Sequence, residues 1–175
     1  ADPIFVGREG SALDQFNYPF MLARGRDGDV LVTAVINARV QLLSLTGKVK
    51  RSIAGFGIEA GDLYRPKGVA CSSDGRVWIS DGTMGVVQVF EPSGQFVEVL
   101  RKAEGTPFHL DSPMGLTFDS DGFLYVVELR AHRVLQLRIE SEPAPRAHPL
   151  GRGDAPSAAQ AQACTVCHLE WMPFS

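Results

Sequence analysis

The chain has 175 residues, of which 45% are hydrophobic and 21% are charged, and its formal net charge is −3. This length suffices for one medium-sized domain with its own core. Lysines and arginines are scattered rather than gathered into a basic stripe, so a nucleic acid is not an expected partner. The chain contains no run of about 18 apolar residues, and the sequence therefore predicts no transmembrane segment.

The N-terminus starts at Ala1 and carries neither a charged n-region nor an apolar h-region. We therefore expect a mature, processed product or a fragment. Of the three cysteines, Cys71 stands alone in a predicted strand, where it is expected to be a small buried core residue rather than a reactive thiol.

An internal repeat of 47 residues runs through the body of the chain. Asp-Gly pairs that begin at Asp27, Asp74 and Asp121 keep this spacing. The same offset separates three valines, Val40, Val87 and Val134. Each repeat predicts short strands separated by turn residues, and four strands in about 40–50 residues is the spacing of a β-propeller blade.

The predicted strands follow one another in the same order in each repeat. The innermost strands are expected at 20–24, 68–72 and 115–119, the second at 30–35, 77–81 and 124–128, the third at 39–43, 86–90 and 133–137, and the outermost at 49–53 and 96–100. An Asp-Gly turn suits the first hairpin of each repeat, because glycine tolerates positive φ.

The second and third repeats resemble NHL repeats. The similarity is carried by residues 66–81 and 87–90 and by residues 113–128, followed by His132-Arg133-Val134. It extends over roughly residues 1–139 and implies a β-propeller made of NHL-like blades. It implies little about function, because NHL propellers bind many partners. His132 falls at the family's usual His/Asn position, where we expect a hydrogen-bonded turn residue.

Three blades do not close a ring, because a propeller generally needs about four to eight, and NHL rings resemble six-bladed ones. Residues 4–7 align at the 47-residue offset with 51–54 and 98–101, so the chain opens with an outermost strand that lacks its own blade. After Ile139, Pro143 and Pro145 cannot continue a strand ladder. The third repeat is therefore expected to lack its outermost strand.

These two defects are complementary. We predict that the N-terminal strand of one chain completes the last blade of another, so that two chains of three blades give a six-bladed homodimer. The alternatives are completion by a different partner chain, a filament, or membership of a longer propeller.

The sequence divides the chain into a half-propeller at 1–139, a Pro/Gly-rich linker at 140–156 and a tail at 157–175. A short helix is predicted from residue 157, and it leads into Cys164-Thr165-Val166-Cys167-His168. This C-x-x-C-H sequence is the attachment signature of a c-type haem. Cys164 and Cys167 are expected to form thioethers to one covalent haem c, with His168 as the proximal iron ligand.

Two other interpretations of this motif are weaker. Zinc needs four ligands, and no second Cys or His pair lies nearby; a thioredoxin-like redox pair would need a βαβ context, which the tail lacks. A cytochrome c domain would need many residues after the motif, and only 169–175 remain. The distal iron ligand is therefore left open between His148 in the linker, His109 in the loop at 106–109, and a ligand from another chain.

The sequence thus predicts a mono-haem c-type cytochrome subunit that passes electrons within a larger redox complex or chain of haems, with the propeller as docking scaffold and no enzymatic activity. Its expected partners are other redox proteins or cytochromes, and its expected location is periplasmic or extracellular. The alternatives are a protein-binding propeller scaffold and an NHL-like hydrolase or lyase, both without a redox role. For an enzyme, Asp81 and Glu128 are the candidate site carboxylates, although they more simply satisfy turn amides.

Overall fold

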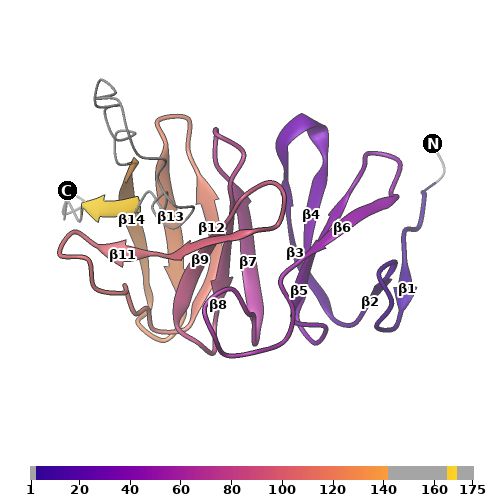
Figure 1. Ribbon diagram of the computed structural model, residues 1–175, viewed down its shortest axis with the longest axis horizontal. Helices are drawn as coiled ribbons and strands as arrows, with labels where there is room; N and C mark the ends of the chain where they lie inside the picture. The colour runs from indigo at the N-terminus through magenta and orange to yellow at the C-terminus, as the bar shows by residue number, and fades with distance from the viewer. Residues whose placement is uncertain (1–2, 142–164, 169–175) are drawn as a thin grey trace, which may run out of the picture.

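The computed structural model describes residues 3–141 and 165–168. Within these ranges the chain forms fifteen strands and one 3-10 turn at Arg26–Gly28. The predicted all-β fold, made of four-stranded antiparallel sheets, is confirmed. Figure 1 shows the sheets following one another along the longest axis, from the indigo N-terminal end to the orange C-terminal end.

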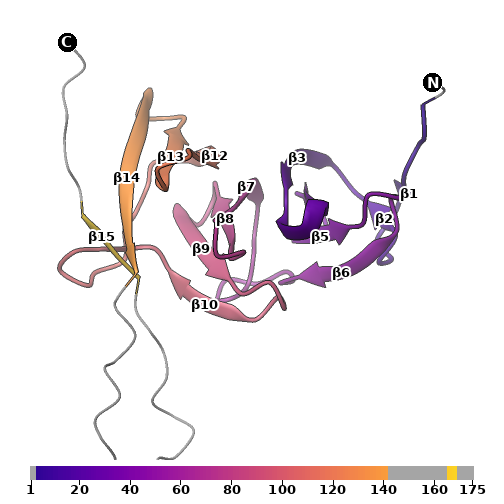
Figure 2. The ribbon, with the colours of Figure 1, turned by 90° about the horizontal axis from the view of Figure 1, so that it is seen from above.

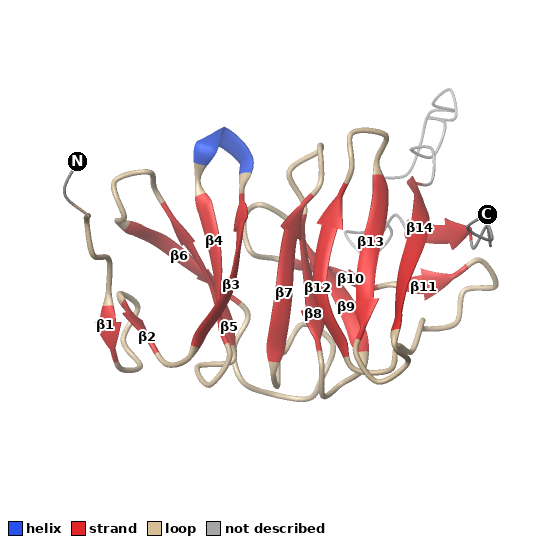
Figure 3. Cartoon of the chain, turned by 180° about the vertical axis from the view of Figure 1, so that it is seen from behind, coloured by secondary structure: helices blue, strands red, loops and turns tan. Residues whose placement is uncertain are grey.

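Three sheets correspond to the three predicted blades. Blade 1 contains β3 (Pro19–Arg24), β4 (Val30–Ala34), β5 (Arg39–Leu43) and β6 (Val49–Ile53). Blade 2 contains β7 (Pro66–Cys71), β8 (Val77–Asp81), β9 (Val86–Phe90) and β10 (Phe96–Val99). Blade 3 contains β12 (Pro113–Phe118), β13 (Phe123–Glu128), β14 (Arg133–Ser141), β15 (Thr165–His168) and β11 (Arg101–Lys102). The inner strands β3, β7 and β12 lie next to one another, as the view from behind also shows (Figure 3).

Burial along the strands follows from the position of each blade. Every residue of β8 and β9 is buried, because blade 2 has a neighbouring blade on each face. In β13 of blade 3, by contrast, the more buried and the more exposed residues alternate. This period of two is the pattern of a strand with only one covered face.

A left-handed turn recurs at the 47-residue spacing. Ala38, Gly85 and His132 have φ of 51°, 69° and 53° and stand between the second and third strands of their blades. The His132 amide donates to the Leu129 carbonyl at 3.4 Å. The structure therefore places His132 in a turn, as the sequence predicts, in the backbone region that a glycine occupies in blade 2.

Two hydrophobic cores lie between the blades, which stand side by side when seen from above (Figure 2). One core joins blade 1 to blade 2 and includes Leu31, Val40 and Val69. The other joins blade 2 to blade 3, and in it the Trp78 and Phe118 rings meet edge to face at 5.4 Å between centroids. Each blade is therefore stabilised chiefly by burial against its neighbours rather than by a core of its own.

A hydroxyl hydrogen bond also joins each pair of neighbouring blades near the inner strands. The Thr33 hydroxyl of blade 1 donates to the Lys67 carbonyl of blade 2 at 3.0 Å. The Ser80 hydroxyl of blade 2, which lies 47 residues later, donates to the Met114 carbonyl of blade 3 at 2.5 Å. We call this repeated bond the interblade latch. The next equivalent residue is Val127, which has no hydroxyl to donate.

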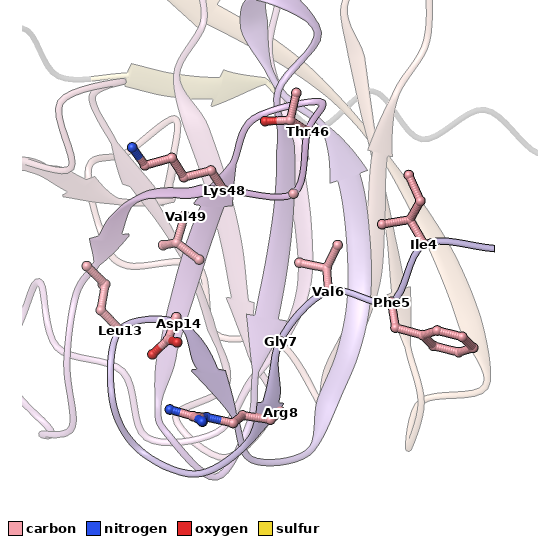
Figure 4. A pocket seen from close by; sticks show the side chains of 11 residues that line it. Ile4, Phe5, Val6, Gly7, Arg8, Leu13, Asp14, Thr46, Lys48 and Val49 are labelled. Atoms are coloured by element: carbon pink, nitrogen blue, oxygen red, sulfur yellow. The ribbon is translucent and has the colours of Figure 1, made fainter. Parts of the chain in front are cut away.

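The N-terminal segment departs from its predicted conformation. Residues 4–7 form no strand, because the described residues provide no neighbouring strand for them, and Ile4 and Phe5 are 86% and 90% exposed. They border an open hollow of about 770 Å³ beside the start of β6 (Figure 4). The next residues keep the repeat: β1 (Arg8–Glu9) pairs in parallel with β2 (Gln15–Phe16), and the bridge between Phe56 and Leu63 is its equivalent in the next repeat.

The outer part of blade 3 also differs from the sequence prediction. Strand β14 runs to Ser141, two residues beyond the predicted boundary at 139. The position expected to be empty beside it is filled by β15, which pairs antiparallel with β14 and parallel with β11. The expectation of a missing outermost strand is therefore wrong for this single chain. The physical reason is that the long edge of β14 offers unpaired backbone groups that a returning segment satisfies.

Candidate functional site

The C-x-x-C-H segment lies at the outer side of blade 3. Val166 and Cys167 of β15 are opposite Glu140 and Ile139 of β14, and opposite Arg101 and Lys102 of β11. Cys164 lies outside the described residues, as does the helix predicted at 157–163. The prediction that a helix presents Cys167 and His168 is wrong, because both residues belong to a strand held by ladders on two sides.

Cys167 and His168 are a thiol and an imidazole, the residue types that attach a c-type haem and supply its proximal iron ligand. The backbone at Thr165–His168 is extended and is paired with β14 and with β11. The second cysteine of the motif, Cys164, lies outside the described residues, so the haem stays a prediction.

Of the two candidate distal ligands, His109 is the one that the structure describes, and it is not brought to β15. His109 is exposed and follows Pro107, which forms a bridge with Arg101. Arg101 pairs with Val166 on its other side, so strand β11 separates the His109 segment from β15. His148 lies outside the described residues, and its role as a ligand stays a prediction.

The two candidate catalytic carboxylates are turn anchors. Asp81 is fully buried, and its Oδ2 accepts from the Tyr64 and Arg65 amides at 2.7 and 2.8 Å. Its Oδ1 accepts from the amides of Thr83 and Met84. The interpretation that this carboxylate satisfies turn amides is therefore confirmed, and it leaves Asp81 no spare oxygen for a substrate.

Glu128 takes the same place in blade 3. Its Oε1 accepts from the Asp111 amide at 2.7 Å, and its Oε2 is paired with the Arg133 guanidinium. The hydrogen bond and charge of Glu128 raise the pKa of Arg133. Among residues 3–141 and 165–168, no group of three or more His, Cys, Asp or Glu side chains is arranged to hold a metal ion.

A polar chain occupies the outer face of blade 3. The Gln136 amide donates to the Tyr125 hydroxyl at 2.9 Å, and that hydroxyl donates to Asp119 at 3.0 Å. Burial opposes ionisation of Asp119, but hydrogen bonds from the Phe123 amide, the Tyr125 hydroxyl and other turn amides outweigh it and lower its pKa. The bond to Asp119 in turn raises the pKa of Tyr125.

Cys71 is only half-buried rather than fully buried as predicted, and it packs against the core between blades 1 and 2. Burial raises the pKa of the Cys71 thiol, which makes it a poor nucleophile at neutral pH.

Sequence reasoning missed the interblade latch and the exposed apolar face of blade 1. The signal for the first was present, because Thr33, Ser80 and Val127 stand at the 47-residue offset. The signal for the second was an apolar series in the first repeat that includes Leu22 and Leu45, which are 71% and 77% exposed.

No family model matches the chain. Among curated proteins, it is 29% identical over 131 residues to Protein brain tumor of Drosophila melanogaster, an NHL-repeat protein, and the match covers 74% of this chain. Among solved structures, it resembles a virginiamycin B lyase from Staphylococcus aureus, with a TM-score of 0.53, 20% identity and 67% of this chain covered. It also resembles a gluconolactonase from Xanthomonas campestris, with a TM-score of 0.51, 18% identity and 66% covered.

These similarities establish the fold, that of a β-propeller. The chain spans 12% of the curated relative and 37% and 36% of the two solved structures, so it corresponds to a part of each.

The comparisons also correct one expectation. The sequence analysis predicted a protein without enzymatic activity, yet structures that share the fold are a lyase and a lactonase. The same fold therefore supports catalysis in these two proteins of known structure, and the prediction that this chain is not an enzyme is withdrawn. Among the described residues, no helix is long and apolar enough to cross a membrane.

Proposed function

We propose that this chain is a propeller scaffold that carries one covalent haem c at Cys164, Cys167 and His168 and takes part in electron transfer between other redox proteins. The observation that carries this proposal is the C-x-x-C-H sequence. Its residue types and spacing are those that attach haem through two thioethers and supply the proximal histidine. The haem, when bound, supplies one-electron redox chemistry.

The proposal includes a location and a partner class. Covalent haem attachment in bacteria takes place outside the cytoplasmic membrane, so the chain is assigned to the periplasm or the cell surface. Its partners are other cytochromes or redox proteins that dock on the propeller. The distal ligand comes from His109, His148 or another chain, and a histidine in that position gives a lower reduction potential than a methionine.

The test is an intact-mass measurement paired with a pyridine haemochrome spectrum on protein purified from its native source. We expect the added mass of one haem and a c-type α band. The matched control is the double variant Cys164→Ala and Cys167→Ala, which should lose both signals, whereas Cys71→Ala should keep them. An unmodified mass with a normal thiol titration at Cys164 and Cys167 would refute the haem.

The second candidate is a propeller that binds a protein, or acts as a hydrolase or lyase, with no redox role. It is favoured by the shared fold of the two enzymes and by the place of β15 in a regular sheet. The double variant Cys164→Ala, Cys167→Ala distinguishes the two candidate functions. If that variant keeps the binding or turnover of the native protein and the electron flow of its complex, the redox proposal fails and the second candidate stands.

A further inference from the structure

A cleft of about 200 Å³ lies between blade 1 and blade 2, next to their Asp-Gly tips. Its apolar wall consists of side chains from the core between these blades, among them Leu31, Ile53 and Val77. Cys71 also lines the cleft, and its thiol donates to the Ser72 carbonyl at 3.6 Å. An apolar wall with a few polar groups at its rim is the common form of a site for a small molecule.

Two arginines of blade 1 reach across the cleft to blade 2. Arg26, in the 3-10 turn drawn blue in Figure 3, donates from Nη1 to the Asp74 carbonyl at 3.3 Å. Its side chain lies so close to Gly75 that a Cβ there would be 3.0 Å from Arg26 Cδ. Arg51 donates from Nη1 to the Pro92 carbonyl at 3.1 Å. Each guanidinium has further N–H donors, and neither takes part in an ion pair among the described residues.

The other charged groups of the cleft leave it with a positive charge. Lys50 Nζ lies 2.6 and 2.7 Å from the two carboxylate oxygens of Asp29, so these two groups neutralise each other. The remaining carboxylate of the lining is that of Asp27, at the exposed tip of blade 1. The lining thus has Arg26, Lys50 and Arg51 against Asp27 and Asp29, one more cation than carboxylates. An anion is therefore the ligand charge that it favours.

The equivalent cleft between blades 2 and 3 has the opposite charge. It measures about 340 Å³, and its charged lining consists of one arginine and several carboxylates, namely Arg76, Asp74, Asp119 and Asp121. At the 47-residue offset, Arg26 corresponds to Ser73 and Arg51 to Glu98. Blades 2 and 3 therefore pack together without an arginine at either position, so the repeat does not need these two cations for its fold.

We infer that the cleft between blades 1 and 2 binds a small organic acid, a carboxylate that carries a compact apolar body. The planar carboxylate accepts charge-assisted hydrogen bonds from the guanidinium groups of Arg26 and Arg51, whose flat donor geometry matches it. The apolar body lies against the wall that includes Leu31 and Val77, where it is removed from water. This site uses none of the haem-attachment residues.

A titration of the full-length chain with benzoate, followed by NMR at the amides of Cys71 and Gly75, tests the inference. We expect saturable shifts with a dissociation constant on the order of 1 mM, as suits so small a ligand. Benzamide has the same shape without the charge, and inorganic phosphate has charge without an apolar body. Both should bind at least about tenfold more weakly than benzoate. Benzamide or phosphate that binds as tightly as benzoate would overturn the inference.

Variants of the two arginines test which groups hold the carboxylate. Arg26→Gln and Arg51→Gln should each raise the dissociation constant for benzoate roughly tenfold, because each removes a charge-assisted hydrogen bond. The matched control is Arg130→Gln, at an exposed position of blade 3, which should leave binding unchanged. Spectra without benzoate show whether each variant is folded. Folded arginine variants that bind benzoate like the original chain would refute the site.

A last comparison separates this site from the proposed haem function. The double variant Cys164→Ala, Cys167→Ala should bind benzoate with the affinity of the original chain, whether or not the original chain carries a haem. Bound benzoate should also slow the alkylation of Cys71 by N-ethylmaleimide, measured by peptide mass mapping, because the thiol lines the same cleft. Unchanged alkylation of Cys71 at saturating benzoate would place the ligand elsewhere and contradict the inference.

Discussion

At the scale of single residues, different side chains near the ends of the second strands accept the same kind of hydrogen bond from a backbone amide. Asp81 in blade 2 and Glu128 in blade 3 accept hydrogen bonds from the backbone that leads into their blades. Blade 1 has Ala34 at this position, and its Asn17 amide donates instead to the Asn37 side-chain oxygen at 2.6 Å. The acceptor is thus retained although its position in the sequence moves by three residues.

We expect Asp81→Ala to lower the free energy of unfolding by about 3 kcal/mol or more, because several amides inside the turn lose their acceptor. Urea unfolding measures this change. Asp81→Asn, which keeps one side-chain oxygen, should cost less. The exposed carboxylate Glu59 serves as the matched control, and Glu59→Ala should change stability by no more than about 0.5 kcal/mol. Equal effects at the two positions would contradict the anchor role.

The lowered pKa of Asp119 predicts a pH dependence of stability. The ionised carboxylate stabilises the folded state above the pKa of the unfolded chain, about 3.9 for aspartate. This contribution is lost as the pH falls through the lower pKa of the folded state. Tm measured from pH 6 to pH 2 should therefore decline less steeply in Asp119→Asn than in the original chain. If Tm falls equally steeply with pH in the two proteins, the lowered pKa of Asp119 is contradicted.

At the scale of strands, the latch predicts an asymmetry along the array. Ser80→Ala removes a bond between blades 2 and 3 and leaves the Met114 carbonyl and the Gly68 amide without that partner. We expect a loss of about 1–2 kcal/mol in the free energy of unfolding. Val127→Ala, at the equivalent position of blade 3, should cost less, because Val127 is partly exposed. Chemical denaturation of both variants measures the two losses in the free energy of unfolding. A larger loss in Val127→Ala than in Ser80→Ala would contradict the interblade latch.

Strand β15 predicts a difference between the haem-free and haem-loaded protein. Both sulfurs, of Cys164 and Cys167, must reach one ring, and β14 pairs with the same segment through Cys167, so we expect attachment to release β14 at its outer edge. Hydrogen exchange of the β14 amides that face β15 should be faster in the haem-loaded protein than in the Cys164→Ala, Cys167→Ala variant. Slower exchange after haem attachment would show that the two states are compatible.

Sequence patterns anticipated the strands of the blades but failed at their outer edges. The order and approximate bounds of the inner strands follow from alternation and from the Asp-Gly turns, which are local signals. The helix expected before Cys164 and His168 rested on local propensity alone. The strand at Thr165–His168 instead depends on the β14 edge far away in the sequence, which no local pattern reports. For the same reason residues 4–7, although patterned as a strand, have no partner here.

At the scale of the whole molecule, the described residues of both hydrophobic cores all precede residue 140. We therefore expect a chain that ends at Ser141 to keep its circular dichroism spectrum and to lose only a few degrees in Tm, the part due to the β15 ladder. Cooperative thermal unfolding of the truncated chain would support this division. A truncated chain without a cooperative transition would show that the tail is part of the folding unit.

The candidate site was predictable only in part at this scale. The C-x-x-C-H signature is recognisable from five neighbouring residues, Cys164 to His168, because its chemistry is local. The distal ligand depends on which surfaces meet in three dimensions, and no local pattern reports this. The exposure of apolar side chains in blade 1, such as Leu22 at 71%, likewise depends on the neighbours of the blade.

The parallel pair of β1 and β2 and its equivalent bridge between Phe56 and Leu63 fix blades 1 and 2 at the point where the chain enters each of them. The Asp-Gly tip of blade 3 lies at the opposite end of its first hairpin, and a Cβ at Gly122 would meet no atom within 4 Å, whereas a Cβ at Gly75 in the tip of blade 2 would meet Arg26 at 3.0 Å. Extra sequence is therefore better tolerated at the tip of blade 3 than at the entry points. A propeller of this kind can acquire a new loop, tag or binding segment at that tip without changing the angle between its blades.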